Sequence, residues 1–140
     1  LLNNRIKDVN FVMEDALSFD GNTGPYAQYT YARTCSILEK AGEVTIDGIR
    51  ITEPAEAALC KVLSQFGEAV LSAVADYEPS DVTRYILDVC TAFNRFYHDC
   101  PILSAVDETA RKSRVALTQA TNYVLGSALP LICLKTPEKI

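Results

Sequence analysis

Proline and glycine divide this chain into segments long enough for helices, and this constrains its fold more than any other feature. Pro25 suits the first turn of a helix because its missing N–H has no partner there, and Asn22 or Thr23 is expected to cap that helix. Gly42 is typical of a helix end, and Pro54, Pro79 and Pro101 mark further boundaries. We therefore expect an all-α fold, a helical bundle of about four main helices. These helices are predicted to cover residues 25–41, 52–77, 80–100 and 107–127.

Within each segment, apolar residues recur at the three- and four-residue spacing that places them on one face of a helix. Pro130 lies inside the last pattern and is expected to end or kink that helix near Ser127. Asp107 is expected to cap its start, and Ser80-Asp81 to cap the helix before it. The expected core stripes contain Ala27, Tyr31, Thr34 and Leu38; Leu59, Val62, Leu63, Phe66, Val70 and Val74; Val82, Ile86, Val89, Phe93 and Phe96; and Ala110, Arg114, Leu117, Thr121, Val124 and Leu125.

Two segments depart from this plan. A short N-terminal helix is expected at 11–18, with Phe11, Ala16, Leu17 and Phe19 as packing groups. Residues 44–51 alternate β-branched side chains around Asp-Gly, which predicts a small β-hairpin. A hairpin of two strands is marginal alone, so it should lie against the helices.

Composition excludes several kinds of function. Net charge is −5, which disfavours non-specific binding to polyanions but not a local site. Five cysteines without a CxxC pair argue against a disulfide framework and a zinc site, and buried free thiols are expected. The one histidine, His98, adjoins Asp99, but neighbours on a helix are not expected to face one another. No catalytic or metal-binding residues are predicted.

The chain begins at Leu1 without a methionine, so we expect it to be a piece of a longer protein or a processed product. No signal peptide is evident, and no apolar run was expected to reach the ~20 residues that cross a bilayer. A cytoplasmic location and no membrane partner are therefore expected.

Residues 21–33 contain the main candidate site. The turn 21–24 resembles no P-loop, because the Lys and Ser/Thr order and a preceding strand are missing. It leads into a helix on which Tyr26, Tyr29 and Arg33 share one stripe. Two aromatic rings and a planar cation could stack on and hydrogen-bond unpaired bases. Core tyrosines with an amphipathic arginine are the alternative interpretation.

The string EDALSFDGNTGPYAQY at 14–29, followed by Ala32-Arg33 and Cys35-Ser36-Ile37-Leu38, resembles arginyl-tRNA synthetases at the junction of catalytic core and anticodon-binding domain. The helix start at 52–54 and the ending at 114–140 follow in the same order. The resemblance implies that 1–20 end the junction with the catalytic core and that 21–140 form a DALR-type anticodon-binding domain. The parent would be a class I arginine–tRNA ligase.

By this resemblance the parent uses Mg-dependent ATP to activate arginine and esterifies it to tRNA. Neither a His-x-Gly-His nor a Lys-Met-Ser-Lys segment occurs here, so the fragment should be non-catalytic and hold no cofactor or metal. Its expected partners are the anticodon stem-loop of tRNA(Arg) and the catalytic core of the same polypeptide. Every arginine anticodon has a central cytosine, which is the expected target.

The resemblance assigns the anticodon pocket to Tyr26, Tyr29 and Arg33, with Asn22 and, less securely, Tyr97. The chain ends Lys139-Ile140 where the family often has Arg-Met, so Ile140 is the expected terminal contact. Possible phosphate contacts are Arg111, Lys112 and Arg114, for which a solvated helix face is the alternative.

A helical protein–protein interaction domain is the alternative function, with the tyrosine stripe as the anchor for a partner helix. Salt dependence separates the two, because phosphate binding weakens steeply with salt and an apolar interface does not.

Overall fold

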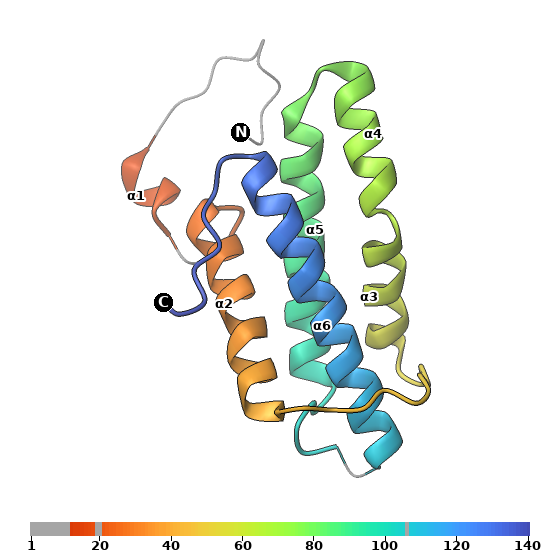
Figure 1. The fold of residues 1–140 in the computed structure, drawn as a ribbon. Helices are drawn as coiled ribbons and strands as arrows, with labels where there is room; N and C mark the ends of the chain where they lie inside the picture. Colours follow the sequence, from red (N-terminus) through yellow and green to blue (C-terminus); the bar gives the residue numbers. More distant parts are fainter. Residues whose placement is uncertain (1–11, 19–20, 106) are drawn as a thin grey trace.

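The computed structural model describes residues 12–18, 21–105 and 107–140, which form a helical bundle without strands (Figure 1). The all-α prediction is confirmed. Four rods make the bundle: α2, α3 followed by α4, α5, and α6, with short α1 beside them. The chain reverses direction between one rod and the next, so rods that are consecutive in the sequence are antiparallel (Figure 1). The helices are α1 Met13–Ala16, α2 Gly24–Ala41, α3 Pro54–Ser64, α4 Phe66–Asp76, α5 Pro79–Asp99 and α6 Glu108–Leu131.

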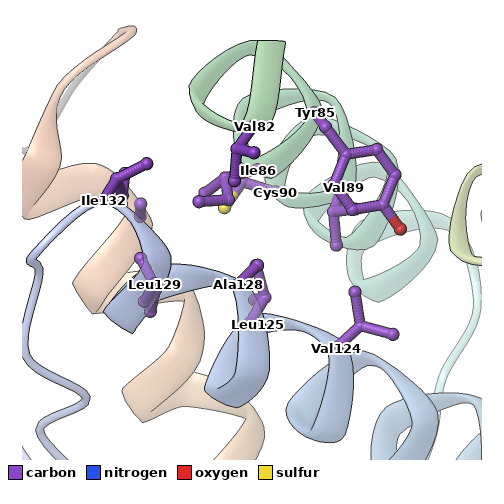
Figure 2. Packing of buried hydrophobic residues seen from close by; sticks show 11 residues of the cluster. Val82, Tyr85, Ile86, Val89, Cys90, Val124, Leu125, Ala128, Leu129 and Ile132 are labelled. Atoms are coloured by element: carbon purple, nitrogen blue, oxygen red, sulfur yellow. The ribbon is translucent and has the colours of Figure 1, made fainter. Parts of the chain in front are cut away.

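α5 is the central rod, in contact with α2, α3, α4 and α6. Its whole predicted stripe is buried, from Val82 to Phe96. Figure 2 shows the upper part of the core, where this stripe faces the inner side of α6. A second cluster surrounds Phe93 and Phe96 at the other end. On α2, Ala27 and Thr34 are buried as predicted, while Tyr31 and Leu38 are half-buried.

The predicted caps hold at three helix termini. Thr23 caps α2, since its Oγ1 accepts a hydrogen bond from the Tyr26 N–H at 3.2 Å. Gly42 ends α2 with φ +68°, a conformation that favours glycine. Asp107 caps α6 by accepting from the Thr109 N–H at 3.1 Å. These local signals fix where the helix with the candidate site begins and ends.

The expected long helix at 52–77 is divided at Gln65, so that prediction was wrong in its middle. The cause lies on α5: the Tyr85 hydroxyl donates to the carbonyls of Val62 at 3.1 Å and Leu63 at 3.4 Å. In a continuous helix these carbonyls would accept from the N–H groups of Phe66 and Gly67; here the Val62 carbonyl accepts from the Gln65 N–H instead, at 3.1 Å. The Tyr85 ring also stacks on Phe66, with centroids 5.8 Å apart.

Two helices end next to non-glycine residues that adopt left-handed backbone. Tyr77 at φ +55° ends α4 where the predicted 52–77 helix was expected to end. The predicted Ser80-Asp81 cap was wrong, because α5 begins at Pro79 with Glu78 as its N-cap. α6 continues through Pro130 to Leu131 instead of ending near Ser127. Cys133 at φ +61° ends it, with its N–H bonded to the Pro130 carbonyl at 3.0 Å.

The predicted hairpin at 44–51 is absent: this segment is an irregular connection with no strand. Its polar groups bond to α6 instead of across a turn. The Arg50 N–H donates to Ser113 Oγ at 2.9 Å, and the Arg50 side chain pairs with Asp107. Lys112 pairs with Asp47 at 2.9 Å. The alternating pattern therefore marks a loop held along the start of α6.

At the N-terminus, the predicted 11–18 helix is seen only as α1, and Phe11 and Phe19 lie outside the described residues. Leu17 is exposed, which does not support its role as a packing group.

The stretch Pro54–Asp76 is long and apolar enough to cross a membrane by length and composition alone, contrary to expectation. The break at Gln65 interrupts it, and both its helices pack on α5. Yet α4 has no fully buried residue: Leu71 is exposed, and so is Val74, whose predicted place in the core was wrong. Val74 lines a shallow apolar hollow of about 590 Å³ together with Leu131 of α6.

Candidate nucleic-acid interface

The predicted recognition residues meet around one guanidinium group. The Arg33 guanidinium carbon lies 4.7 Å from the ring centroid of Tyr29 and 4.9 Å from that of Tyr97. The two rings are 41% and 46% exposed, so both offer area to a ligand. A cation over an aromatic ring is attracted by the ring's quadrupole. The structure thus joins a residue from the end of α5 to the stripe on α2.

A hydrogen-bond network orders this cluster. Arg33 donates from Nη2 to the Tyr29 hydroxyl at 3.0 Å and from Nη1 to Asn94 Oδ1. Asn94 Nδ2 donates to the Tyr26 hydroxyl at 2.9 Å and to Thr30 Oγ1 at 3.1 Å. Tyr26, Tyr29 and Arg33 are therefore connected through a residue that sequence reasoning missed. The only indication of Asn94 in the sequence is its position directly after Phe93, a predicted core residue.

The surrounding helices hold the cluster in place. The Tyr97 ring stacks on Phe93, which is fully buried, with centroids 6.5 Å apart and planes at 24°. Beneath the stripe, α2 presents the small buried side chains of Ala27 and Thr30, which let it approach the neighbouring helices. Rings fixed on rigid helices lose little conformational freedom when a base stacks on them.

The other predicted contacts lie elsewhere along α2 or beyond it. Asn22 is exposed in the turn before α2. Ile140 is exposed at the end of a tail that runs beside α2 (Figure 1). Two bonds hold that tail: Gln28 Nε2 donates to the Lys135 carbonyl at 2.9 Å, and Lys139 Nζ lies 3.7 Å from Glu39.

The three predicted phosphate contacts have structural partners at the start of α6. Arg114 is only 11% exposed, and it bonds Glu56 at 2.7 Å and the Pro101 carbonyl at 2.9 Å. Arg111 donates to the Ala41 carbonyl at 3.3 Å. Lys112 holds the 44–51 segment, as described above. All three cations therefore bond to other segments of the protein and connect the start of α6 to them.

His98 and Asp99 are in contact, contrary to expectation, with Nδ1 and Oδ1 2.9 Å apart. The His98 side chain is 88% exposed. The hydrogen bond from His98 lowers the pKa of the Asp99 carboxyl. The pair extends the exposed end of α5 and does not form an enclosed acid–base site.

The described residues contain no group of three potential metal ligands. All five thiols are free. Cys90 and Cys100 are buried as expected, but Cys133 is exposed at its left-handed position. Burial raises the pKa of the Cys90 thiol to about 12, which makes it inert near neutral pH.

Comparison with known proteins gives a consistent result. The family described as "DALR anticodon binding domain" matches residues 27–140. The chain is similar over its whole length to the arginine–tRNA ligases of Alkaliphilus metalliredigens, at 45% identity, and Clostridioides difficile, at 46%. It spans 25% of each of those proteins.

Two solved structures share the fold. The arginyl-tRNA synthetase of Thermus thermophilus matches 96% of this chain with a TM-score of 0.89 and 36% identity. That of Plasmodium falciparum matches 99% with a TM-score of 0.88 and 26% identity. The chain covers 24% and 25% of those two proteins, respectively.

Proposed function

The chain belongs to the DALR anticodon-binding domain family, and we propose that it is the tRNA-recognition part of an arginine–tRNA ligase. The family match over residues 27–140, together with relatives named arginine–tRNA ligase that match the whole chain, confirms the resemblance to arginyl-tRNA synthetases. The whole enzyme would join arginine to its tRNA with Mg-dependent ATP in the cytoplasm. Its catalytic core would precede this domain, with 1–20 as the junction. That larger activity is supported by relatives about four times as long.

The base that this domain reads is, in our proposal, the central cytosine of the arginine anticodon. All arginine codons have guanine in the middle, so this cytosine is common to all arginine anticodons. The observation that carries the proposal is the placement of Arg33 over two half-exposed rings, Tyr29 and Tyr97. An unstacked base could stack on such a ring while the guanidinium bonds to its edge.

Asn22 and Ile140 extend the proposed interface at the two ends of the α2 surface. We leave Arg111, Lys112 and Arg114 out of it, because their side chains already bond within the protein.

A gel-shift titration with tRNA(Arg) tests the proposal. Arg33→Ala should cost about 1–3 kcal/mol of binding free energy, the range for a base-contacting arginine. Arg84→Ala is the matched control, since it removes an exposed arginine from α5 that pairs with Asp81 instead. Equal losses of tRNA affinity in the two variants would show that Arg33 contributes only its positive charge, and would contradict a role in base recognition.

The same titration at increasing salt separates this function from a protein-interaction domain. RNA binding should weaken steeply with salt because bound cations are released from phosphates. The far-ultraviolet circular dichroism of each variant should match that of the parent chain.

A further inference from the structure

We propose that Asn94 is a positioning residue that sets the hydrogen-bond direction of the recognition cluster, so that the cluster selects cytosine over uracil. The inference rests on the proposed function. It assigns a role to a side chain on α5, opposite the stripe on α2. Asn94 is the shared partner of Tyr26, Thr30 and Arg33.

The orientation of the Asn94 amide follows from Thr30. The Thr30 hydroxyl donates its only proton to the Tyr26 backbone carbonyl at 3.0 Å. It can then only accept from Asn94, which requires the amide nitrogen to face it at 3.1 Å. Thr30 is fully buried, so water does not offer an alternative partner. The amide oxygen is left facing Arg33.

This orientation fixes what Tyr26 and Arg33 can offer a ligand. The second proton of Asn94 Nδ2 goes to the Tyr26 hydroxyl at 2.9 Å, so that oxygen accepts and its own proton remains to donate. Arg33 uses one proton of each Nη nitrogen within the protein. A guanidinium has five N–H groups and no acceptor, so three donors remain. These two side chains therefore present donors.

A surface of donors discriminates between the two pyrimidines. The Watson–Crick edge of cytosine has two adjacent acceptors, N3 and O2. Uracil has an N–H at position 3, which would face another donor and lose its hydrogen bond. A donor or acceptor left unpaired on binding carries the full cost of its desolvation. By directing the Tyr26 proton outward, Asn94 favours cytosine.

Asn94→Asp tests this role in the 140-residue chain. The carboxylate still accepts from Arg33, but it places an acceptor where Nδ2 was, so the Tyr26 hydroxyl must donate inward. The added negative charge weakens binding to any RNA, so the readout is a ratio. That ratio compares affinities for tRNA(Arg) with cytosine and with uracil as the middle anticodon base. It should fall by about fivefold or more, the effect of one misdirected buried hydrogen bond.

Asn122→Asp is the matched control. Asn122 bonds Thr34 and Cys35 from α6 and is not part of the Arg33 network. The same chemical change there should leave the cytosine-to-uracil ratio unchanged. An equal fall in both variants would overturn the proposal.

Tyr26→Phe provides a second variant that does not depend on the folding of Asn94→Asp. It removes the hydroxyl and should also lower the ratio. If Asn94 acts through Tyr26, the two substitutions remove the same outward donor, the Tyr26 hydroxyl. The double variant should then show the same ratio as the lower of the two single variants. If Tyr26→Phe or folded Asn94→Asp keeps the cytosine-to-uracil ratio of the parent chain, the role of Asn94 is refuted while the proposed function stands. No cytosine preference in the parent chain would instead refute the proposed function.

Discussion

Replacing Glu56 by alanine should destabilise the bundle more than any surface change. Glu56 is 1% exposed, and its Oε1 lies 2.7 Å from Arg114 Nε. Its Oε2 accepts from the Thr52 and Glu53 N–H groups at 2.8 and 3.1 Å, which completes a capping box at the start of α3. One carboxylate therefore joins the end of one rod to another and caps a helix.

The expected magnitude comes from the charge that the substitution leaves behind. Breaking one side of a buried ion pair costs about 3–5 kcal/mol, because the remaining charge stays buried without compensation. Total stabilities of domains are about 5–15 kcal/mol, so this is a large fraction. Replacing Glu56 and Arg114 together by apolar residues should cost less than the sum of the two single changes.

Urea unfolding followed by circular dichroism measures this loss. Lys112→Met is the control, because its ion pair with Asp47 is partly exposed and should contribute far less. A loss below about 1 kcal/mol for Glu56→Ala, the range of surface pairs, would refute the reasoning.

The same residue predicts a pH dependence. Burial opposes its ionisation, but the Thr52 N–H, Arg114 and the Glu53 N–H outweigh burial and hold the pKa of Glu56 below its ordinary 4.5. Between the folded and unfolded pKa values, the unfolded chain binds more protons, so stability rises with pH there. The contribution is complete above pH ~4.5 and disappears as pH falls through the folded pKa. Glu56→Gln should remove this part of the acid sensitivity.

Two further predictions concern backbone and thiols. Gly42→Ala should cost about 1–3 kcal/mol of unfolding free energy in urea, since alanine is strained at φ +68°; Gly48→Ala, without a positive φ, should cost less, and equal costs would contradict this. With a thiol reagent such as Ellman's, Cys133 should react first and Cys90 only on unfolding. A fast phase that survives in Cys133→Ser would disprove that order.

The number of rods and the inner face of α5 could be predicted because they depend on local spacing. The stripe from Val82 to Phe96 is an example, since every member is buried. The caps at Thr23 and Asp107 and the glycine end at Gly42 are local in the same way. Each of these features is decided within a few residues of chain.

Three of the errors arose where residues far away in the sequence determine the local structure. The break at Gln65 depends on the Tyr85 hydroxyl, and the 44–51 segment depends on Ser113 and its neighbours on α6. Asn94 was missed because its partners lie more than 60 residues away on α2. No pattern within one helix reports such contacts. The stripe on α2 was predicted, but the network that orders it required the fold.

The most direct test of base reading by this domain is a cycle that varies Arg33 and the middle anticodon base together. The affinities of the parent chain and Arg33→Ala are measured for tRNA(Arg) with cytosine or uracil at that position. We predict that the parent chain prefers cytosine at least about tenfold, or about 1.4 kcal/mol, and that Arg33→Ala loses most of this preference. An equal preference in both proteins, or none in the parent chain, would contradict the account.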